Sequence, residues 1–172
     1  MRNPRIICES ERGISLKLEF RTPLHWAALN GDDERVRTLL SKGAAPDVWA
    51  NCETPLHCAA RRGHRSVILI LLDAGANIHS RRFINYEASI TDYTPLHIAV
   101  GNDHIETVIV LIERGADVNA FAGYAGSPAE YARHTPLDWA SWNGFHTSEE
   151  VRNLLVSHGA RHSRDIDRDE RH

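Results

Sequence analysis

Thr54-Pro55-Leu56-His57 is one of four copies of a tetrapeptide that decides the fold of this 172-residue chain. The other copies are Thr22-Pro23-Leu24-His25, Thr94-Pro95-Leu96-His97 and Thr135-Pro136-Leu137-Asp138. Each copy is followed by one variable residue and then by Ala-Ala or a close variant, such as Ala59-Ala60. A Gly-Ala pair closes each unit, at Gly43, Gly75, Gly115 and Gly159. Four matches to so long a pattern indicate an internal repeat.

Two short helices make up each predicted unit. Thr is a good N-cap, and Pro suits the first helical turn because its φ is already set. A turn at Gly31, Gly63 or Gly144 leads to a second helix, whose apolar spacing is plain in residues 67–72. The glycine of the Gly-Ala pair stands where a left-handed residue ends that helix. Because one helix pair cannot bury its own apolar face, the units must stack, and the sequence predicts an all-α repeat solenoid.

This pattern resembles the ankyrin repeat, whose unit of about 33 residues carries the signature T-P-L-H-x-A. The resemblance covers residues 22–161, in four repeats at 22–53, 54–93, 94–134 and 135–161. It implies a curved stack of helix-turn-helix units with β-hairpin fingers that project at roughly right angles. In that family the fingers and first helices form a concave surface that binds other proteins. The resemblance therefore implies a protein-binding module.

Two further segments flank the four repeats. Residues 1–21 are expected to form an N-terminal cap: Glu11-Arg12-Gly13 echoes the helix-ending Glu113-Arg114-Gly115, which favours a decayed half-repeat. The alternation of apolar and polar residues over 14–20 favours a half-buried strand instead, and both alternatives stay open. Residues 162–172 are rich in charge and are predicted to be a solvated, mobile tail. In the fourth repeat, Thr147-Ser148-Glu149-Glu150 is interpreted as a capping box that begins the second helix.

Two of the expected fingers are longer than the first. The Thr-to-Thr spacing is 32 residues for the first repeat but 40 and 41 for the next two. The extra residues lie between the helix-ending glycine and the next threonine, which lengthens the fingers. These fingers hold six of the twelve aromatic residues: Phe83, Tyr86, Tyr93, Phe121, Tyr124 and Tyr131. They serve either as anchors of a protein interface or as a small local core, and both interpretations stay open.

The resemblance also implies which residues contact a partner protein. They follow the small pair of each first helix or stand just before each threonine. The predicted partner-binding residues are Arg61, Arg62, Tyr93, Asn102, His134, Trp142 and Asn143, together with the six finger aromatics; Arg21, Leu29, Asn30, Glu53 and Gly101 occupy the same two kinds of position. Trp26 and Trp139 are expected in the core, which makes Trp142 the most telling candidate. Arg61, Arg62, Arg81 and Arg82 are a candidate positive strip for an acidic partner patch.

Eleven histidines raise the question of metal binding or catalysis. His25, His57 and His97 fill the fourth place of the tetrapeptide, and His64 and His104 begin second helices, so these five are predicted to be structural. No thiols or carboxylates accompany them at zinc-like spacing, and no metal or other cofactor is expected. Cys58 is predicted to be a small buried hydrophobe, since a reactive thiolate needs an exposed electropositive niche.

The composition narrows the classes of function. The formal charge of −3 has the wrong sign for phosphate-driven nucleic-acid binding, and the longest apolar run is too short to span a bilayer. Three cysteines without a CxxC pair indicate inert thiols in a reducing, cytoplasmic compartment. The leading hypothesis is a monomeric module that binds another protein without catalysis. The alternatives are a metal- or thiol-dependent enzyme that uses the His and Cys content, and a self-associating structural unit.

Overall fold

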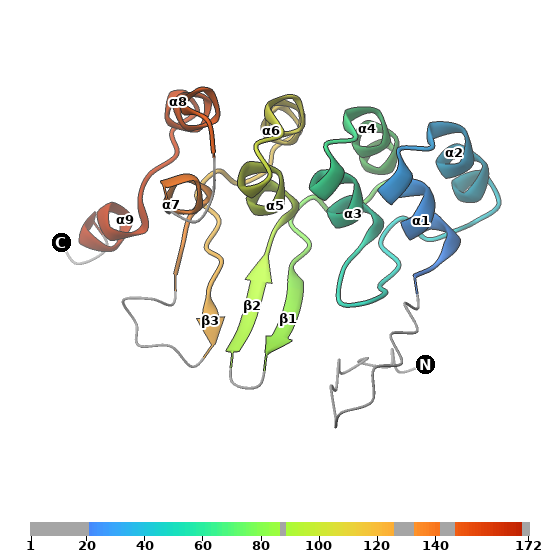
Figure 1. The fold of residues 1–172 in the computed structure, drawn as a ribbon, viewed down its shortest axis with the longest axis horizontal. Helices are drawn as coiled ribbons and strands as arrows, with labels where there is room; N and C mark the ends of the chain where they lie inside the picture. The colour runs from blue at the N-terminus through green and yellow to red at the C-terminus, as the bar shows by residue number, and fades with distance from the viewer. Residues whose placement is uncertain (1–20, 87–88, 126–132, 142–146, 170–172) are drawn as a thin grey trace.

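The computed structural model describes residues 21–86, 89–125, 133–141 and 147–169, with the backbone alone for 82–91, 124–125 and 167. Four helix pairs stand side by side (Figure 1). They are α1 (Pro23–Asn30) with α2 (Asp33–Ser41), α3 (Pro55–Arg62) with α4 (Arg65–Asp73), α5 (Pro95–Gly101) with α6 (Ile105–Glu113), and α7 (Pro136–Ser141) with α8 (Glu149–Ser157). The first helices form one row, the second helices form the other, and the fingers project from the first row. The predicted repeat solenoid is confirmed.

The helix boundaries follow from the repeated residues. Thr22, Thr54 and Thr94 are N-caps with extended backbone, and each is followed by Pro in the first turn of a first helix. The glycine after each second helix has a left-handed φ, between 83° and 89°. The second helix of the fourth repeat begins differently from the prediction. Its N-cap is Ser148, which accepts a hydrogen bond from the Val151 N–H, so the interpretation of Thr147 as the capping residue is wrong.

One continuous core runs through the stack between the two rows of helices. The leucine of each tetrapeptide is at most 5 % exposed, and the small residues that follow it are buried, apart from the exposed Ser141 of the fourth repeat. The second helices contribute Val36, Val67, Ile68, Leu71, Val108, Leu111, Val151 and Leu155, all fully buried. Each helix pair therefore buries its apolar face against the next pair as well as within itself, as stacking requires.

Buried histidines tie each repeat to the next. In the first three repeats the threonine hydroxyl lies 2.8 Å from Nδ1 of the tetrapeptide histidine. The other ring nitrogen, Nε2, lies 3.0 to 3.2 Å from the backbone carbonyl oxygen of the residue just before the threonine of the next repeat: His25 reaches Glu53, His57 reaches Tyr93 and His97 reaches His134. A carbonyl oxygen only accepts, so Nε2 carries the proton and Nδ1 accepts from the threonine. The structural role predicted for these three histidines is confirmed.

A second set of histidines explains two glycines. His64 and His104 are N-caps of second helices, and their Nε2 atoms lie 3.0 Å from the carbonyl oxygens of Leu29 and Arg61 in the preceding repeat. A Cβ on Gly31 would lie 2.7 Å from Nδ1 of His64, and a Cβ on Gly63 would lie 2.8 Å from Nδ1 of His104. Both glycines also have a φ of 71°, so a side chain there would be strained and would collide with the ring. In the fourth repeat the Thr147 hydroxyl donates to the Val100 carbonyl in place of a histidine.

The fourth repeat has Asp138 where the others have histidine, and this carboxylate holds the C-terminal segment. Its Oδ2 accepts from the backbone N–H groups of Thr135 and Ser163, and its Oδ1 lies 2.7 Å from Nδ1 of His162. Helix α9 (Ser163–Asp169) follows directly, and Arg161 bonds Asp169 within it. The segment expected to be a mobile tail therefore carries a helix whose start is bonded to α7.

The fingers differ in size and in pairing. The first is a tight hairpin in which Ala50 and Glu53 exchange two backbone hydrogen bonds around Asn51 and Cys52, both with positive φ. The two long fingers share one antiparallel sheet, because β1 (Arg82–Tyr86) pairs with β2 (Ser89–Tyr93) and β2 pairs with β3 (Tyr124–Ala125). The Arg81 guanidinium reinforces this junction by donating to the Asp92 carboxylate at 2.7 Å and to the Phe121 carbonyl at 2.6 Å.

Two expectations concern the cysteines and the N-terminal segment. Cys58 is a free, buried thiol, as expected, whereas Cys52 takes part in a disulfide bond, so the expectation of inert thiols is wrong for Cys52. The cap, half-repeat and strand alternatives for residues 1–20 fall outside the described residues.

Candidate functional site

The residues that differ most between repeats line the bases of the fingers and the adjoining surface of the first helices. At the position just before each threonine stand Arg21, Glu53, Tyr93 and His134, and at the fourth residue after it stand Trp26, Cys58, Ile98 and Trp139. The backbone at both positions is held by the repeated threonine, proline and histidine contacts. Two clusters of different chemistry occupy them, one between repeats 1 and 2 and one between repeats 3 and 4.

We call the first the Glu53 cluster; it consists of Arg21, Trp26, Glu53, Cys58 and Arg61, with the exposed Arg62 next to Arg61 in the chain. The Glu53 side chain is 1 % exposed, and its Oε1 accepts from Arg21 at 3.1 Å and from the Cys58 thiol at 3.2 Å. Its Oε2 accepts from the Arg61 guanidinium. Arg21 also lies 5.4 Å from the centre of the Trp26 ring, at cation–π distance. One buried carboxylate therefore fixes two guanidinium groups beside a partly exposed tryptophan.

We call the second the Tyr93 cluster; it consists of Tyr93, His97, His134 and Trp139. The Tyr93 and Trp139 rings lie 4.7 Å apart and tilted by 47°, within the range of favourable aromatic pairs. The ring of His134 is 6.5 Å from Trp139, and that of His97 is 6.3 Å from Tyr93. Burial lowers the pKa of His97 to about 4, even though its hydrogen bond to the His134 carbonyl acts in the opposite direction. This cluster is built on ring contacts, whereas the Glu53 cluster is built on ion pairs.

The finger aromatics divide between described and undescribed side chains. Tyr93 is half-buried against the core, and Phe121 is half-buried with the Arg133 guanidinium 3.7 Å from its ring centre. Both rings therefore make local contacts and keep part of their surface exposed. Phe83 and Tyr86 lie on β1 and Tyr124 on β3, but their side chains, like all of Tyr131, fall outside the described residues. The choice between interface anchor and local core stays open for those four.

The other predicted contact residues lie at the ends of first helices. Arg62 is the exposed last residue of α3, and Arg61 beside it is half-exposed with its guanidinium on Glu53. Asn102 is exposed as the C-cap of α5, and its side-chain amide donates to the Ile98 carbonyl at 2.7 Å. Trp142 and Asn143 fall outside the described residues, as does the side chain of Arg82. The structure thus places Arg61 in the Glu53 cluster, with the exposed Arg62 next to it in the chain, and places Tyr93 and His134 in the Tyr93 cluster.

Three expectations from the sequence are wrong. Trp26 was expected in the core but is 41 % exposed, and Trp139 is only partly buried, because this position faces the finger side of the first helix. The smaller Cys58 at the same position is covered by the Glu53 carboxylate, whereas a tryptophan ring extends beyond such a cover. Glu53 was expected to contact a partner but is buried, since Arg21 and Arg61 enclose its carboxylate. Glu53 and Arg21 stand just before the threonines of successive repeats and carry opposite charges, and this was the signal in the sequence that they form an ion pair.

The described residues offer little to the enzyme alternative. Burial, with the nearby Glu53 carboxylate, raises the pKa of the Cys58 thiol to about 12, so it lacks the thiolate character that covalent catalysis needs. In the part of the chain that the structure describes, no group of three or more His, Cys, Asp or Glu side chains is placed to hold a metal ion. Within those same residues, every helix is too short or too polar for a membrane span.

Comparison with known proteins agrees with the repeat architecture. A family profile described as ankyrin repeats (3 copies) matches residues 5–82 and 81–166. The chain is 43 % identical over 61 residues to palmitoyltransferase Hip14 of Drosophila melanogaster, which covers 34 % of the chain and 10 % of that protein. It is 45 % identical over 56 residues to palmitoyltransferase ZDHHC13 of Mus musculus, covering 31 % and 9 %. The chain therefore matches about a tenth of the length of these relatives, and the match by itself shows no enzymatic activity.

Proposed function

The chain belongs to the ankyrin-repeat family, and we propose that it binds another protein on the surface formed by its finger bases and first helices. One observation carries the proposal. The threonine–histidine ties recur in the first three repeats, whereas the four residues just before the threonines are Arg, Glu, Tyr and His. A surface used only for packing would have no reason to vary on so regular a scaffold. Loops and variable positions on a rigid scaffold are where binding residues concentrate.

The proposed contacts are those that the repeat positions imply. They are Arg61, Arg62, Tyr93, Asn102, His134, Trp142 and Asn143, with Phe83, Tyr86, Phe121, Tyr124 and Tyr131 on the long fingers. Trp26 joins them because it is exposed on the same surface. Aromatic and arginine side chains are enriched among the residues that carry most of the binding free energy in protein interfaces. We propose binding as a monomer, without a cofactor and without catalysis.

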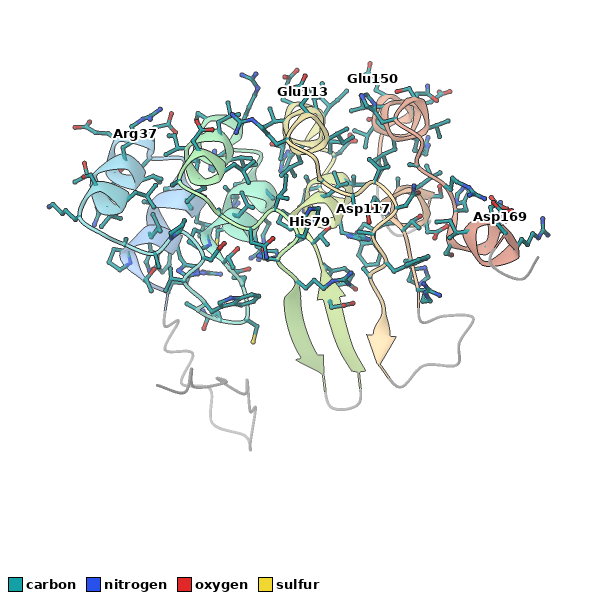
Figure 2. All side chains as sticks on the ribbon, turned by 180° about the vertical axis from the view of Figure 1, so that it is seen from behind. Arg37, His79, Glu113, Asp117, Glu150 and Asp169 are labelled. Atoms are coloured by element: carbon teal, nitrogen blue, oxygen red, sulfur yellow. The ribbon has the colours of Figure 1, made fainter. Side chains whose placement is uncertain are left out.

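The test begins with affinity capture of a partner from the source cell and its identification by mass spectrometry. Binding of the purified partner is then measured for Arg62→Ala, Asn102→Ala and Trp142→Ala, with Arg37→Ala on α2 as the control. Arg37 is exposed on a second helix, away from the finger side (Figure 2). We expect weaker binding for the three variants and unchanged binding for Arg37→Ala, with helicity and melting temperature preserved in all. Equal binding by all four proteins would overturn the assignment of this surface.

The self-associating alternative has a separate test. Light scattering at two protein concentrations gives the mass of the species in solution, and we expect the monomer mass of 19.3 kDa at both. A mass that rises with concentration would favour a structural unit that binds copies of itself. Binding of a second protein by that assembly would then have to be measured again at a concentration where the monomer prevails.

A further inference from the structure

The charges of the molecule are divided between its two rows of helices. The second helices α2, α4, α6 and α8 carry seven carboxylates against four guanidinium groups. Glu113 and Glu150 illustrate this on α6 and α8 (Figure 2). The described first helices and the residues just before them carry Arg21, Arg61 and Arg62 against Glu53 and Asp138. This row of first helices therefore carries more arginine than carboxylate, while the row of second helices carries more carboxylate than arginine and the chain as a whole has a formal charge of −3.

The two carboxylates in the row of first helices, Glu53 and Asp138, are engaged within the protein. Glu53 is 1 % exposed and accepts from Arg21, Arg61 and Cys58, while Asp138 accepts from Thr135, His162 and Ser163. The side chains of Arg21 and Arg61 remain 13 % and 26 % exposed, and Arg62 is exposed. Arg21 and Arg61 thus keep part of their side chains at the surface around the buried carboxylate, and the exposed Arg62 is next to Arg61 in the chain. Solvent at this end of the surface thus meets arginine.

We propose that the Glu53 cluster is a binding site for an acidic segment of a partner protein, one that presents Asp or Glu carboxylates to Arg61 and Arg62. This inference rests on the proposed function and names the chemistry of the partner. Arginine suits the task because its planar guanidinium pairs with a carboxylate through two parallel hydrogen bonds. The charge division favours the approach of an acidic segment to this surface and disfavours its approach to the second helices.

Glu53 acts as a positioning residue in this site. An isolated surface arginine loses side-chain freedom when it binds, which weakens most exposed ion pairs. Here the buried carboxylate already holds the Arg21 and Arg61 guanidinium groups. These side chains therefore lose their conformational freedom when the chain folds, and little more is lost when a partner binds. Trp26, 41 % exposed with the Arg21 guanidinium over its ring, adds an apolar surface for a side chain next to the partner's carboxylates.

The experiment uses a fluorescein-labelled octaglutamate peptide and the full chain, with fluorescence anisotropy measured in 20 mM and 200 mM NaCl. Octaserine and the oligonucleotide dT8 serve as comparison probes. We expect octaglutamate to bind, to bind more weakly at the higher salt concentration, and to bind more tightly than either comparison probe. No binding of octaglutamate would overturn the proposal. Tighter binding of dT8 would overturn it in favour of a nucleic-acid ligand.

Charge-reversal variants locate the site. Arg62→Glu is expected to weaken octaglutamate binding by about five-fold or more, the effect of losing one favourable ion pair and adding a repulsive one. Arg37→Glu on α2 makes the same change in net charge on the opposite side of the molecule and is expected to leave binding nearly unchanged. Circular dichroism and thermal melting confirm that both variants are folded. Equal weakening by the two variants would mean that net charge alone attracts the peptide, and the site assignment would fall.

The variant Glu53→Gln separates positioning from charge. It raises the net charge by one, so binding governed by charge alone would become tighter. If Glu53 positions the arginines, octaglutamate binding becomes weaker in spite of the added positive charge, and tighter binding would overturn that role. The outcomes also distinguish this inference from the proposed function. If octaglutamate does not bind while Asn102→Ala and Trp142→Ala still weaken binding of the purified partner, then only the proposal of an acidic partner segment is overturned, and the proposed binding surface stands.

Discussion

The Glu53 cluster and the Tyr93 cluster occupy equivalent positions of the same repeat and stabilise their junctions by different means. In the first, a fully buried carboxylate joins guanidinium groups from two repeats, and a tryptophan stands exposed beside them. In the second, two aromatic rings at 4.7 Å make the contact, next to a sheet shared by the long fingers. The tetrapeptide ties beneath both clusters are alike. The scaffold therefore leaves these positions free to differ, and the difference gives one end of the surface charge and the other end aromatic area.

The largest expected effect tests the ties that both clusters share. The pKa of His97 is about 4 in the folded chain against 6.5 unfolded, since burial disfavours its charged form. Between these values the unfolded state binds more protons, so the stability contributed by neutral His97 is present above pH 6.5 and lost as the pH falls toward 4. The loss amounts to about 3 kcal/mol. Urea unfolding at pH 7 and pH 4 gives the fall in the free energy of unfolding for the native chain and for His97→Gln, which lacks the titrating group. The difference between the two falls is the contribution of His97.

His25 sharpens the comparison at the other junction. Burial also lowers its pKa, but the carbonyl and carboxylate of Glu53 both act to raise it. We expect His25→Gln to remove a smaller part of the acid-induced loss than His97→Gln does. An equal or larger effect of His25→Gln would mean that Glu53 does not offset the lowering of the His25 pKa by burial.

The next effect concerns the ionic junction alone. Glu53→Gln leaves the two arginines without their buried negative partner, and we expect the free energy of unfolding to fall by about 2 kcal/mol. Breaking a fully enclosed ion pair would lower the free energy of unfolding further, but here both guanidinium groups reach solvent. Urea unfolding in 0.1 M and 1 M NaCl measures it. A loss that disappears at high salt would show an exposed, screened pair and would contradict the burial of Glu53.

The repeat units could be predicted from the sequence because their signals are local. A threonine followed by proline caps a helix in any context, and a glycine at the end of a second helix adopts a positive φ, as at Gly75 and Gly115. The spacing between Thr54 and Thr94 likewise located the extra residues in a finger. Each of these inferences depends on neighbours within a few residues in the chain.

The clusters could not be predicted because their partners are distant in the chain. Glu53 is enclosed by Arg61 in the next helix and by Arg21, 32 residues earlier, and nothing near Glu53 in the sequence reports the contact with Arg21. The pairing of β2 with β3 depends on two insertions whose lengths do not state their register. The exposure of Trp26 follows from the side of the helix on which it lies, where Cys58 and Ile98 are small enough to be covered. The tail helix α9 depends on the bond between Asp138 and His162 across 24 residues.

A smaller effect tests the aromatic junction. We expect the coupling free energy between Tyr93 and Trp139 to be about 1 kcal/mol, from a double-mutant cycle of Tyr93→Leu, Trp139→Leu and the double variant. Urea unfolding of the four proteins gives the value. The same cycle for Tyr93 with Ile98, which shares the repeat position of Trp139 but lies one repeat earlier, is the matched control. Coupling that is equal in the two cycles would mean that the ring contact contributes nothing beyond buried area.

The smallest effect separates two adjacent arginines of the ionic junction. Arg61→Ala removes a guanidinium that lies on a buried carboxylate, and we expect the free energy of unfolding to fall by about 1 kcal/mol. Arg62→Ala removes an exposed side chain, and we expect a change within about 0.5 kcal/mol, as for most surface substitutions. Urea unfolding of both variants measures the contrast. If Arg62→Ala costs as much as Arg61→Ala, then Arg62 holds the stack together, and the exposed charge that distinguishes the Glu53 cluster from the Tyr93 cluster is a packing contact.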